Sequence, residues 1–341
     1  MESVALFRLP GDRHYTRLVS SRPPKILPSL DIIRQESGFL IAPFHQSDIC
    51  PAVLIQPDET TTTLLPEDTD AHESAISEAQ QIPSSYQEDF TRFHGAVWDG
   101  HFSKLVLAHS VELSYTACES ELQQLFIRAC LQYPDFMVIL FSTSQTGLWL
   151  IASPEVLIEG HDTTWHTMAM AGTAAYTDSD IPWSDKNREE QMLVERFVRD
   201  TLEHFASDIS TDGPKTFPAG HLKHLRTDFS FSIEASRLGE LISALHPTPA
   251  VSGLPRNEAV RFILEHEHLE RTYYSGFCGP VNLHGETHLY VSLRCAKLDT
   301  ASREAVLYAG GGLMPQSQCQ EEWTEIWQKM QTINNVLHHV Q

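Results

Sequence analysis

The sequence of 341 residues has little positive charge, no long apolar run and no paired cysteine motif. It holds 24 Lys and Arg against 45 Asp and Glu, and the net charge of -21 argues against nonspecific binding to nucleic acid or to an anionic membrane. The longest apolar runs, such as 136–141, are too short to span a bilayer, and residues 1–22 contain scattered arginines rather than a secretory signal. We therefore expect a cytoplasmic globular protein.

Several sequence patterns of metal and nucleotide sites are also missing. The six cysteines form no C-x-x-C pair, so we expect reduced, mostly buried thiols rather than a zinc site or a disulfide framework. The Glu-His-Glu-His cluster at 265–268 lacks the i, i+4 histidine pair of a helical zinc site, and we interpret it as a solvated helix face. No G-x-G-x-x-G follows a strand and the glycines at 310–312 lack the Lys-Ser/Thr ending of a Walker motif, so nothing supports nucleotide binding.

What is present is a regular alternation of helical and strand-like spacings. Helices are predicted at 86–101, 122–131, 184–205, 235–245 and 257–266. Strands are predicted at 104–111, 136–141, 147–152, 165–171, 225–233, 276–281, 288–297 and 305–309. A polar loop is predicted near 57–85. Strand pairs at short turns alternate with isolated helices, which predicts an α+β fold of antiparallel sheets flanked by helices.

The last third of the chain carries the most informative local pattern. An apolar strand enters a predicted glycine turn at 310–312, and the acidic helix that follows places Glu322, Glu325 and Lys329 on one face. This face has the groups to hold a cation, and the alternative is a capped strand followed by a solvated helix. The rigid loop 245–255, with three prolines and a glycine, is of the kind that often lines a site.

Three further positions carry charged groups whose setting matters. Lys104 opens an apolar strand, where burial would lower its pKa, or its ammonium group reaches water. Glu155 follows a strand and is expected at the start of a helix, as an acid in the first turn. The helix at 184–205, with Ser184 as its N-cap, has either a solvated charged face or a glutamate that points inward to join a carboxylate set suited to Mg²⁺.

Taken together, ten sequence blocks occur in the order and approximate spacing of the chorismate-utilising enzymes. They are Lys104-Leu-Val-Leu-Ala, Ser153-Pro-Glu155, Ala171-Gly-Thr173, Lys186-Asn-Arg-Glu-Glu190, His224-Leu225 with Thr227, His246-Pro-Thr-Pro-Ala, Tyr274, Arg294, Tyr308-Ala-Gly-Gly-Gly and Glu322-Trp-Thr-Glu325 with Lys329. The chain resembles the isochorismate synthases most closely, over roughly 86–336. The resemblance implies one α/β sandwich of large antiparallel sheets with outer helices, in which 1–85 belongs to the same fold and 86–341 is the chorismate-binding catalytic region.

The resemblance also implies a Mg²⁺-dependent isomerase site. Its metal ligands would be Glu190, Glu322 and Glu325. Its substrate contacts would be Gly172, Thr173, His224, Tyr274, Arg294, Gly311 and Lys329. Lys104, as a neutral amine, would take a proton from the water that attacks C2 of chorismate, and Glu155, as an acid, would protonate the hydroxyl leaving C4.

Alternatives remain within the family and beyond it. A lysine at position 104 is typical of relatives that use water rather than ammonia, so no glutamine amidotransferase subunit is expected, and the chain is expected to be a monomer or homodimer that supplies menaquinone or a siderophore. A salicylate synthase, which goes on to eliminate pyruvate, is the alternative enzyme, and a chorismate-binding subunit without turnover is the alternative outside catalysis. Three departures from the family pattern are His109, Gln191 and the segment 174–176.

Overall fold

The fold is built from two antiparallel sheets, in a computed structural model that describes residues 2–67, 79, 81–176 and 182–338. The first sheet has nine described strands. In spatial order they are β14 (Gly253–Leu254), β7 (Lys104–Ser114), β18 (Glu304–Leu313), β17 (Cys295–Asp299), β9 (Gly147–Ser153), β8 (Met137–Thr143), β1 (Ser3–Arg8), β2 (His14–Ser20) and β6 (Glu59–Leu64). The order mixes strands from both ends of the chain, so the sheet forms only when distant segments meet.

The second sheet also has nine described strands and the same antiparallel pairing. Its spatial order is β12 (Ser207–Ala219), β13 (Leu222–Ser232), β11 (Thr164–Ala175), β10 (Val156–His161), β16 (Glu286–Val291), β15 (Phe277–Val281), β4 (Gly38–Ala42), β5 (Ala52–Ile55) and β3 (Lys25–Leu27). Helices accompany both sheets. They are η1 (Leu30–Gln35), α1 (Ser84–Trp98), η2 (Glu119–Glu121), α2 (Leu122–Gln132), α3 (Asp185–Phe205), η3 (Ala235–Arg237), α4 (Leu238–Leu245), α5 (Arg256–His266) and α6 (Cys319–Leu337).

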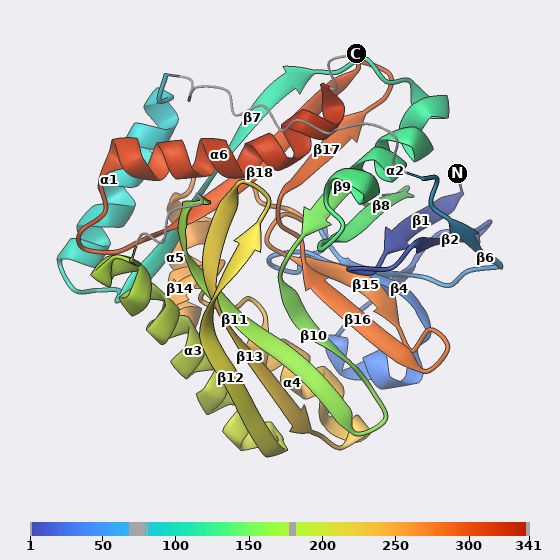
Figure 1. Cartoon of the computed structure of the whole chain (residues 1–341), viewed down its shortest axis with the longest axis horizontal. Helices are drawn as coiled ribbons and strands as arrows, with labels where there is room; N and C mark the ends of the chain where they lie inside the picture. The colour runs from blue at the N-terminus through green and yellow to red at the C-terminus, as the bar shows by residue number, and fades with distance from the viewer. Residues whose placement is uncertain (1, 68–78, 80, 177–181, 339–341) are drawn as a thin grey trace.

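The elements stack in four layers, helices outside and sheets inside (Figure 1). Apolar residues of α1, α2, α5 and α6 pack on the outer face of the first sheet, and those of α3 and α4 pack on the outer face of the second. A third apolar cluster, which includes Phe39, Trp149 and Met168, fills the space between the sheets. Burial on both faces explains why many strands are apolar throughout rather than alternating. The α+β class predicted from the sequence is confirmed.

The N-terminal segment contributes to both sheets. β1 lies between β2 and β8 of the first sheet, and β4 lies between β15 and β5 of the second. The prediction of a polar loop near 57–85 was wrong at its start, because β6 pairs with β2 there. Every residue of β6 is exposed, so this edge strand has no apolar face, while its β-branched threonines favour an extended chain. The rest of that loop falls largely on 68–78 and 80, outside the described residues.

Three other predictions need correction in the same region of the fold. No glycine turn precedes α6, because β18 continues through Gly310, Gly311 and Gly312, each paired with β7. Glu155 precedes strand β10 rather than a helix. The strand predicted at 288–297 is two strands, β16 and β17, which lie in different sheets.

The Glu-His-Glu-His cluster at 265–268 is solvated only in part, because Glu265 and His268 are exposed while the Glu267 side chain is not. The Glu267 side chain is fully buried and forms two hydrogen bonds with the Arg271 guanidinium, at 2.6 and 2.7 Å. His268 Nδ1 lies 2.6 Å from Oδ1 of the buried Asp89. Charges counted along the predicted helix at 257–266 do not reveal these contacts, because Arg271 and Asp89 lie outside it.

The six cysteines are free thiols, of which three (Cys130, Cys278 and Cys295) are buried. None of the described helices combines the length and apolar character needed to cross a membrane.

Candidate active site

The candidate site lies where the chain crosses between the two sheets. β9 of the first sheet ends at Ser153 and β10 of the second begins at Val156, which places Glu155 on the crossover. In the same way Arg294 lies between β16 of the second sheet and β17 of the first, with a backbone φ of 47°. A non-glycine residue in this left-handed region is costly, so the surrounding fold must hold it there.

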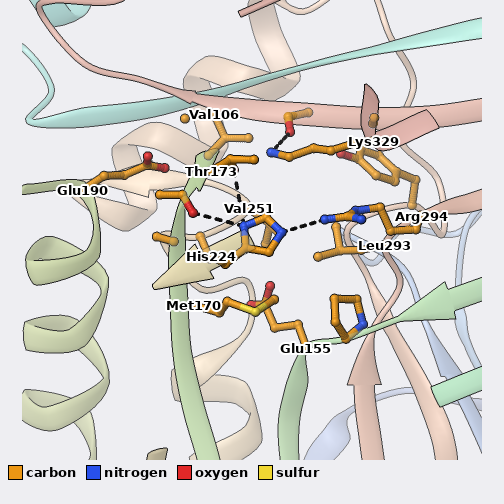
Figure 2. Close-up of a pocket in the computed structure, with 18 residues that line it drawn as sticks. Val106, Glu155, Met170, Thr173, Glu190, His224, Val251, Leu293, Arg294 and Lys329 are labelled. Carbon is orange, nitrogen blue, oxygen red and sulfur yellow. Dashed lines mark hydrogen bonds between the residues drawn. The ribbon is translucent and has the colours of Figure 1, made fainter. Parts of the chain in front are cut away.

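A pocket opens at this crossing, and Figure 2 shows side chains from several distant elements directed into it. Its polar lining consists of Glu155, Thr173, Glu190, His224, Tyr274, Arg294 and Lys329. Its apolar walls include Val106, Met170, Val251 and Leu293. Apolar walls with a few convergent charged groups are typical of sites for small polar molecules.

A chain of hydrogen bonds fixes His224 and Arg294 in the middle of the pocket (Figure 2). The Arg294 guanidinium can only donate, so its contact of 2.8 Å makes His224 Nε2 the acceptor. His224 therefore carries its proton on Nδ1 and donates it to the Gly172 carbonyl oxygen at 3.0 Å. Burial and the charges of Arg294 and Lys329 lower the pKa of His224 to about 3, so the ring stays neutral at physiological pH.

Glu155 is buried, and its environment favours the protonated acid. Burial raises its pKa to about 7, although the positive charges of Lys104, Lys329 and Arg294 act in the opposite direction. The Glu155 side chain lines the pocket opposite Lys329 in Figure 2. A carboxyl group with a pKa near 7 can give up a proton at neutral pH, as a general acid must.

Lys104 lies behind the pocket wall, where it pairs with Glu190. Its side chain is fully buried, and Nζ lies 3.0 Å from Glu190 Oε1. The pair needs the glycine opposite it: a Cβ at Gly312 would lie 2.2 Å from Glu190 Oε1 and 2.6 Å from Lys104 Cε. β18 thus passes close to the pair only because residue 312 has no side chain.

The first turns of α6 supply two more carboxylates beside the same strand. A Cβ at Gly311 would lie 3.3 Å from Glu322 Oε2 and 3.6 Å from Glu325 Oε1, so both acids face this one residue. Glu325 Oε1 accepts a hydrogen bond from Lys329 Nζ at 2.7 Å, and Lys329 also donates to the Gly310 carbonyl oxygen at 2.9 Å. Glu322 Oε1 accepts a hydrogen bond from Lys186 Nζ.

The two neighbouring acids of α6 have opposite tendencies to ionise. Burial and the charge of Glu325 raise the pKa of Glu322, while Lys186 opposes this rise. Burial acts to raise the pKa of Glu325 as well, but the charge and hydrogen bond of Lys329 outweigh it, so the net shift is downward. Among the described residues, Glu322 Oε2 is buried with no hydrogen-bond partner. As the side chains stand, no group of three or more acidic, histidine or cysteine residues in the described chain is gathered around a metal position.

The edge of the pocket next to α3 depends on a β-bulge at Gly172. The register between β11 and β13 shifts there, and Gly172 adopts a φ of 72°. Gln191 on α3 accepts from Ala171 N at 2.8 Å and donates to the Ala169 carbonyl oxygen at 3.0 Å. The Gln191 side chain therefore attaches α3 to β11, the strand that carries Gly172. Because Gln191 directly follows Glu190 in the sequence, this attachment lies next to Glu190.

A buried ion pair supports the opposite wall. Besides its contacts with Glu267, Arg271 donates to the carbonyl oxygens of Val251 and Val106, at 2.7 and 2.9 Å. Glu267 Oε1 in turn accepts from Ala108 N at 2.8 Å. Val106 and Val251 both line the pocket, so this pair holds β7 and the loop after α4 in place. The loop predicted to line a site does so through Ala250 and Val251.

All twelve predicted site residues meet in this region. Eight line the pocket: Glu155, Gly172, Thr173, Glu190, His224, Tyr274, Arg294 and Lys329. The other four, Lys104, Gly311, Glu322 and Glu325, lie directly behind its glycine-rich wall. Their roles in binding and catalysis stay predictions.

Sequence reasoning missed Lys186 as a site residue and Gly312 as the glycine required by Lys104. The i, i+4 spacing of Lys186 and Glu190 on one helix was a usable signal. Of the departures, His109 packs against the rings of Tyr86 and Trp323, with centroid distances of 5.8 and 5.6 Å. Residues 174–176 are the end of β11 and the position after it.

Comparisons with known proteins agree with the geometry. The chorismate binding enzyme family matches residues 32–338. A Mycobacterium tuberculosis protein named as an isochorismate synthase, MenF, is 32% identical over 261 residues, covering 71% of this chain and 69% of the relative. The isochorismate synthase EntC of Escherichia coli is 27% identical over 277 residues, covering 76% of this chain and 69% of EntC.

A solved structure extends the similarity to the whole fold. The structure of MenF, the menaquinone-specific isochorismate synthase from Escherichia coli, superposes with a TM-score of 0.80 at 21% identity, over 98% of this chain and 89% of that chain. At this identity the match shows a shared fold. With the family match to 32–338, the resemblance predicted from the sequence is confirmed, and the chain belongs to the chorismate-binding enzyme family.

Proposed function

We propose that this protein is an isochorismate synthase, which converts chorismate to isochorismate by adding water at C2 of the ring with loss of the C4 hydroxyl. The observation that carries the proposal is the combination of a buried acid, Glu155, whose pKa is about 7, with a buried lysine, Lys104, at one pocket. Two relatives are named for this activity, and their alignments with this chain cover 69% of each relative's length.

The cationic side of the pocket suits a dianion. Arg294 and Lys329 face the pocket in a chain whose net charge is -21. Arg294 uses N–H groups for His224 and Thr332, and a guanidinium has further donors for a substrate carboxylate. Neutral His224 keeps Arg294 in place without adding charge, so the positive potential stays on the two cations.

The proton transfers are assigned to two residues. Lys104, as the neutral amine, takes a proton from the attacking water, and Glu155 gives a proton to the departing hydroxyl group. Glu155 meets its requirement near neutral pH because about half of it is protonated at its pKa of about 7. The apolar walls, including Met170 and Leu293, limit competing access of bulk water.

A divalent cation, expected to be Mg²⁺, belongs to the proposal. Carboxylate oxygens are the ligands that Mg²⁺ prefers. Glu322 and Glu325 both present oxygens to Gly311, and Glu190 presents an oxygen to the next residue, Gly312. The unpartnered, buried Glu322 Oε2 is a polar atom that a cation would satisfy. These three acids would hold the ion, which when bound would neutralise a substrate carboxylate.

Water rather than ammonia is the proposed nucleophile, since Lys104 stands where ammonia-using relatives typically lack a lysine. We therefore expect activity without an amidotransferase subunit, in the cytoplasm, from a monomer or homodimer.

Product analysis tests the proposal directly. The purified protein is incubated with chorismate and Mg²⁺, and the products are separated by chromatography. Isochorismate is the expected product, whereas salicylate with pyruvate identifies a salicylate synthase. Chorismate left intact with every divalent cation tried overturns both enzyme functions.

A further inference from the structure

Three lysines neutralise the three acids that face the glycines of β18. Lys104 pairs with Glu190 at 3.0 Å, Lys329 pairs with Glu325 at 2.7 Å, and Lys186 pairs with Glu322. In this ligand-free structure Lys104 is counted as the ammonium group that pairs with Glu190, before it gives up the proton that its role as a base requires. In that state the three positive and three negative charges cancel within the cluster. A divalent cation entering it without substrate would meet no net negative charge, so one of the ammonium groups must give way for the ion to bind tightly.

Burial and bonding show which lysine is free to leave. Lys104 is fully buried, and Lys329 is 14% exposed and anchored a second time by the Gly310 carbonyl. Lys186 is the most exposed of the three, at 21%, and its Nζ is hydrogen-bonded to Glu322 in the described structure. It lies in the first turn of α3, at the outer edge of the cluster, with a flexible stem that reaches water readily.

We propose that Lys186 is the internal counter-ion of the metal site. Its ammonium group is paired with the Glu322 carboxylate while no divalent cation is bound. When the cation binds, Lys186 moves away and leaves this carboxylate to the metal. The proposal rests on the proposed function only in taking a divalent cation as the ligand of these acids. It assigns to Lys186 the control of metal affinity, separate from the binding of the substrate and from the proton transfers.

The test measures Mg²⁺ affinity in the absence of chorismate. Chelator-treated wild type, Lys186→Met, Lys186→Gln and Arg188→Met are titrated with MgCl2 by isothermal calorimetry. Lys186→Met and Lys186→Gln should bind Mg²⁺ about tenfold more tightly or better, because a competing charge has been removed. Arg188→Met is the matched control: it removes one exposed positive charge from the same turn of α3 and should stay within about twofold of wild type.

A second measurement separates competition from a general effect on folding. In chelator, Lys186→Met should melt at a lower temperature than wild type, because Glu322 loses its cation, and added Mg²⁺ should raise its melting temperature more than that of wild type. Lys186→Gln keeps a donor for Glu322 and serves if the methionine variant does not fold.

The outcomes distinguish this proposal from the proposed function. If both Lys186 variants bind Mg²⁺ no more tightly than wild type, the counter-ion role is wrong, while a wild type that converts chorismate leaves the proposed function standing. If neither the wild type nor any variant binds Mg²⁺, the counter-ion role is also wrong, and the chorismate assay decides the proposed function separately.

Discussion

Glu155 and His224 show how burial at one site moves two pKa values in opposite directions. Desolvation disfavours the charged form of each group, which raises the pKa of the carboxyl group to about 7 and lowers that of the imidazole to about 3. Both side chains are therefore able to be neutral in the same pocket at pH 7. Arg294 and Lys329 supply the positive charge there. Burial lowers the pKa of Arg294 to about 10, which is still well above 7, so Arg294 stays protonated.

The pH dependence of turnover should report Glu155. The acid form is required, so kcat/KM, which reports the pKa of the free enzyme, should fall as pH rises above about 7, by about tenfold for each further pH unit. Glu155→Gln, which cannot donate this proton, should lower kcat by about 10²- to 10⁴-fold and lose this descending limb. The measurement is kcat/KM against pH for wild type and variant. A variant that keeps the same limb would show that another group titrates.

The same pKa has a consequence for folding that needs no substrate. Because folding raises the pKa of Glu155, its contribution to stability is fully present below its unfolded value of 4.5 and is lost as pH rises through about 7. Glu155→Gln has no such loss. The variant should therefore gain stability relative to wild type between pH 5 and pH 8, as measured by urea denaturation at each pH.

Lys104 tests the assignment of the base. Lys104→Met keeps most of the buried stem but removes the amine, so turnover should fall by about 10²- to 10⁴-fold. Far-UV circular dichroism should stay as in wild type. Turnover at the wild-type rate in a folded variant would rule out this lysine as the base.

At the scale of elements, strand β18 is the wall on which the acid and lysine side chains converge. Its glycines do different things: Gly312 admits the Lys104–Glu190 pair, and Gly311 faces the two acids of α6. Three successive glycines lower the stability of the strand. Because they have no side chains, the backbone of β18 can lie within contact distance of charged groups.

The two glycines should respond differently to alanine. In Gly312→Ala the new Cβ would lie 2.2 Å from Glu190 Oε1, so the buried pair must move and turnover should fall by about 100-fold or more. In Gly311→Ala the nearest atom lies at 3.3 Å, and a small shift of Glu322 relieves the contact. Activity of both variants is compared together with their melting temperatures. A smaller loss in Gly312→Ala than in Gly311→Ala would contradict this account of the wall.

The buried pair of Glu267 and Arg271 links three elements, and breaking it should destabilise the protein. Arg271→Met leaves the fully buried Glu267 without its cation, at a cost of about 3–5 kcal/mol. The double variant Glu267→Gln with Arg271→Met removes both charges and should recover part of this loss. Urea denaturation of the wild type, the two single variants and the double variant measures the coupling; additive losses would mean that the pair contributes no coupling energy.

The periodicity of apolar residues predicts an element well where the whole segment packs against a single neighbour. The long helix α3, with Ser184 as its N-cap, was predicted almost to the residue because its apolar face and cap are local features. β6 was missed because an edge strand needs no apolar face. The break at Arg294 could not be predicted from the local sequence, because one half of the apolar run joins the second sheet as β16 and the other half joins the first sheet as β17.

The site was predictable in its membership but not in its pairing. The blocks that carry the family resemblance contain every polar or charged residue that lines the pocket, whereas the apolar residues Met170, Val251 and Leu293 lie outside them. Spacing along the chain does not say which lysine faces which acid. Lys186 belongs to one of those blocks, and its contact with Glu322 comes from α6, 136 residues away. Long-range partners of this kind depend on the packing of α3 and α6 against the sheets.

At the scale of the whole molecule, the two sheets form one unit with the site at their junction. The crossovers at Glu155 and Arg294 tie β9 to β10 and β16 to β17, and the N-terminal strands β1 and β4 lie inside the sheets rather than beside them. The apolar cluster between the sheets takes residues from both. The division near residue 85 is therefore a feature of the sequence and not a boundary between separately packed cores.

This continuity predicts that the catalytic region does not fold without the N-terminal strands. A fragment of residues 82–341 would lose β1, which pairs with β8, and β4, which pairs with β15, so two central strands would become unprotected edges. It would also expose buried residues such as Phe7 and Phe39. We expect the fragment to aggregate or to lack a cooperative unfolding transition, whereas the full chain should unfold in one transition that coincides by tryptophan fluorescence and far-UV circular dichroism. A monomeric fragment that melts cooperatively and consumes chorismate would show instead that residues 86–341 are a domain in their own right.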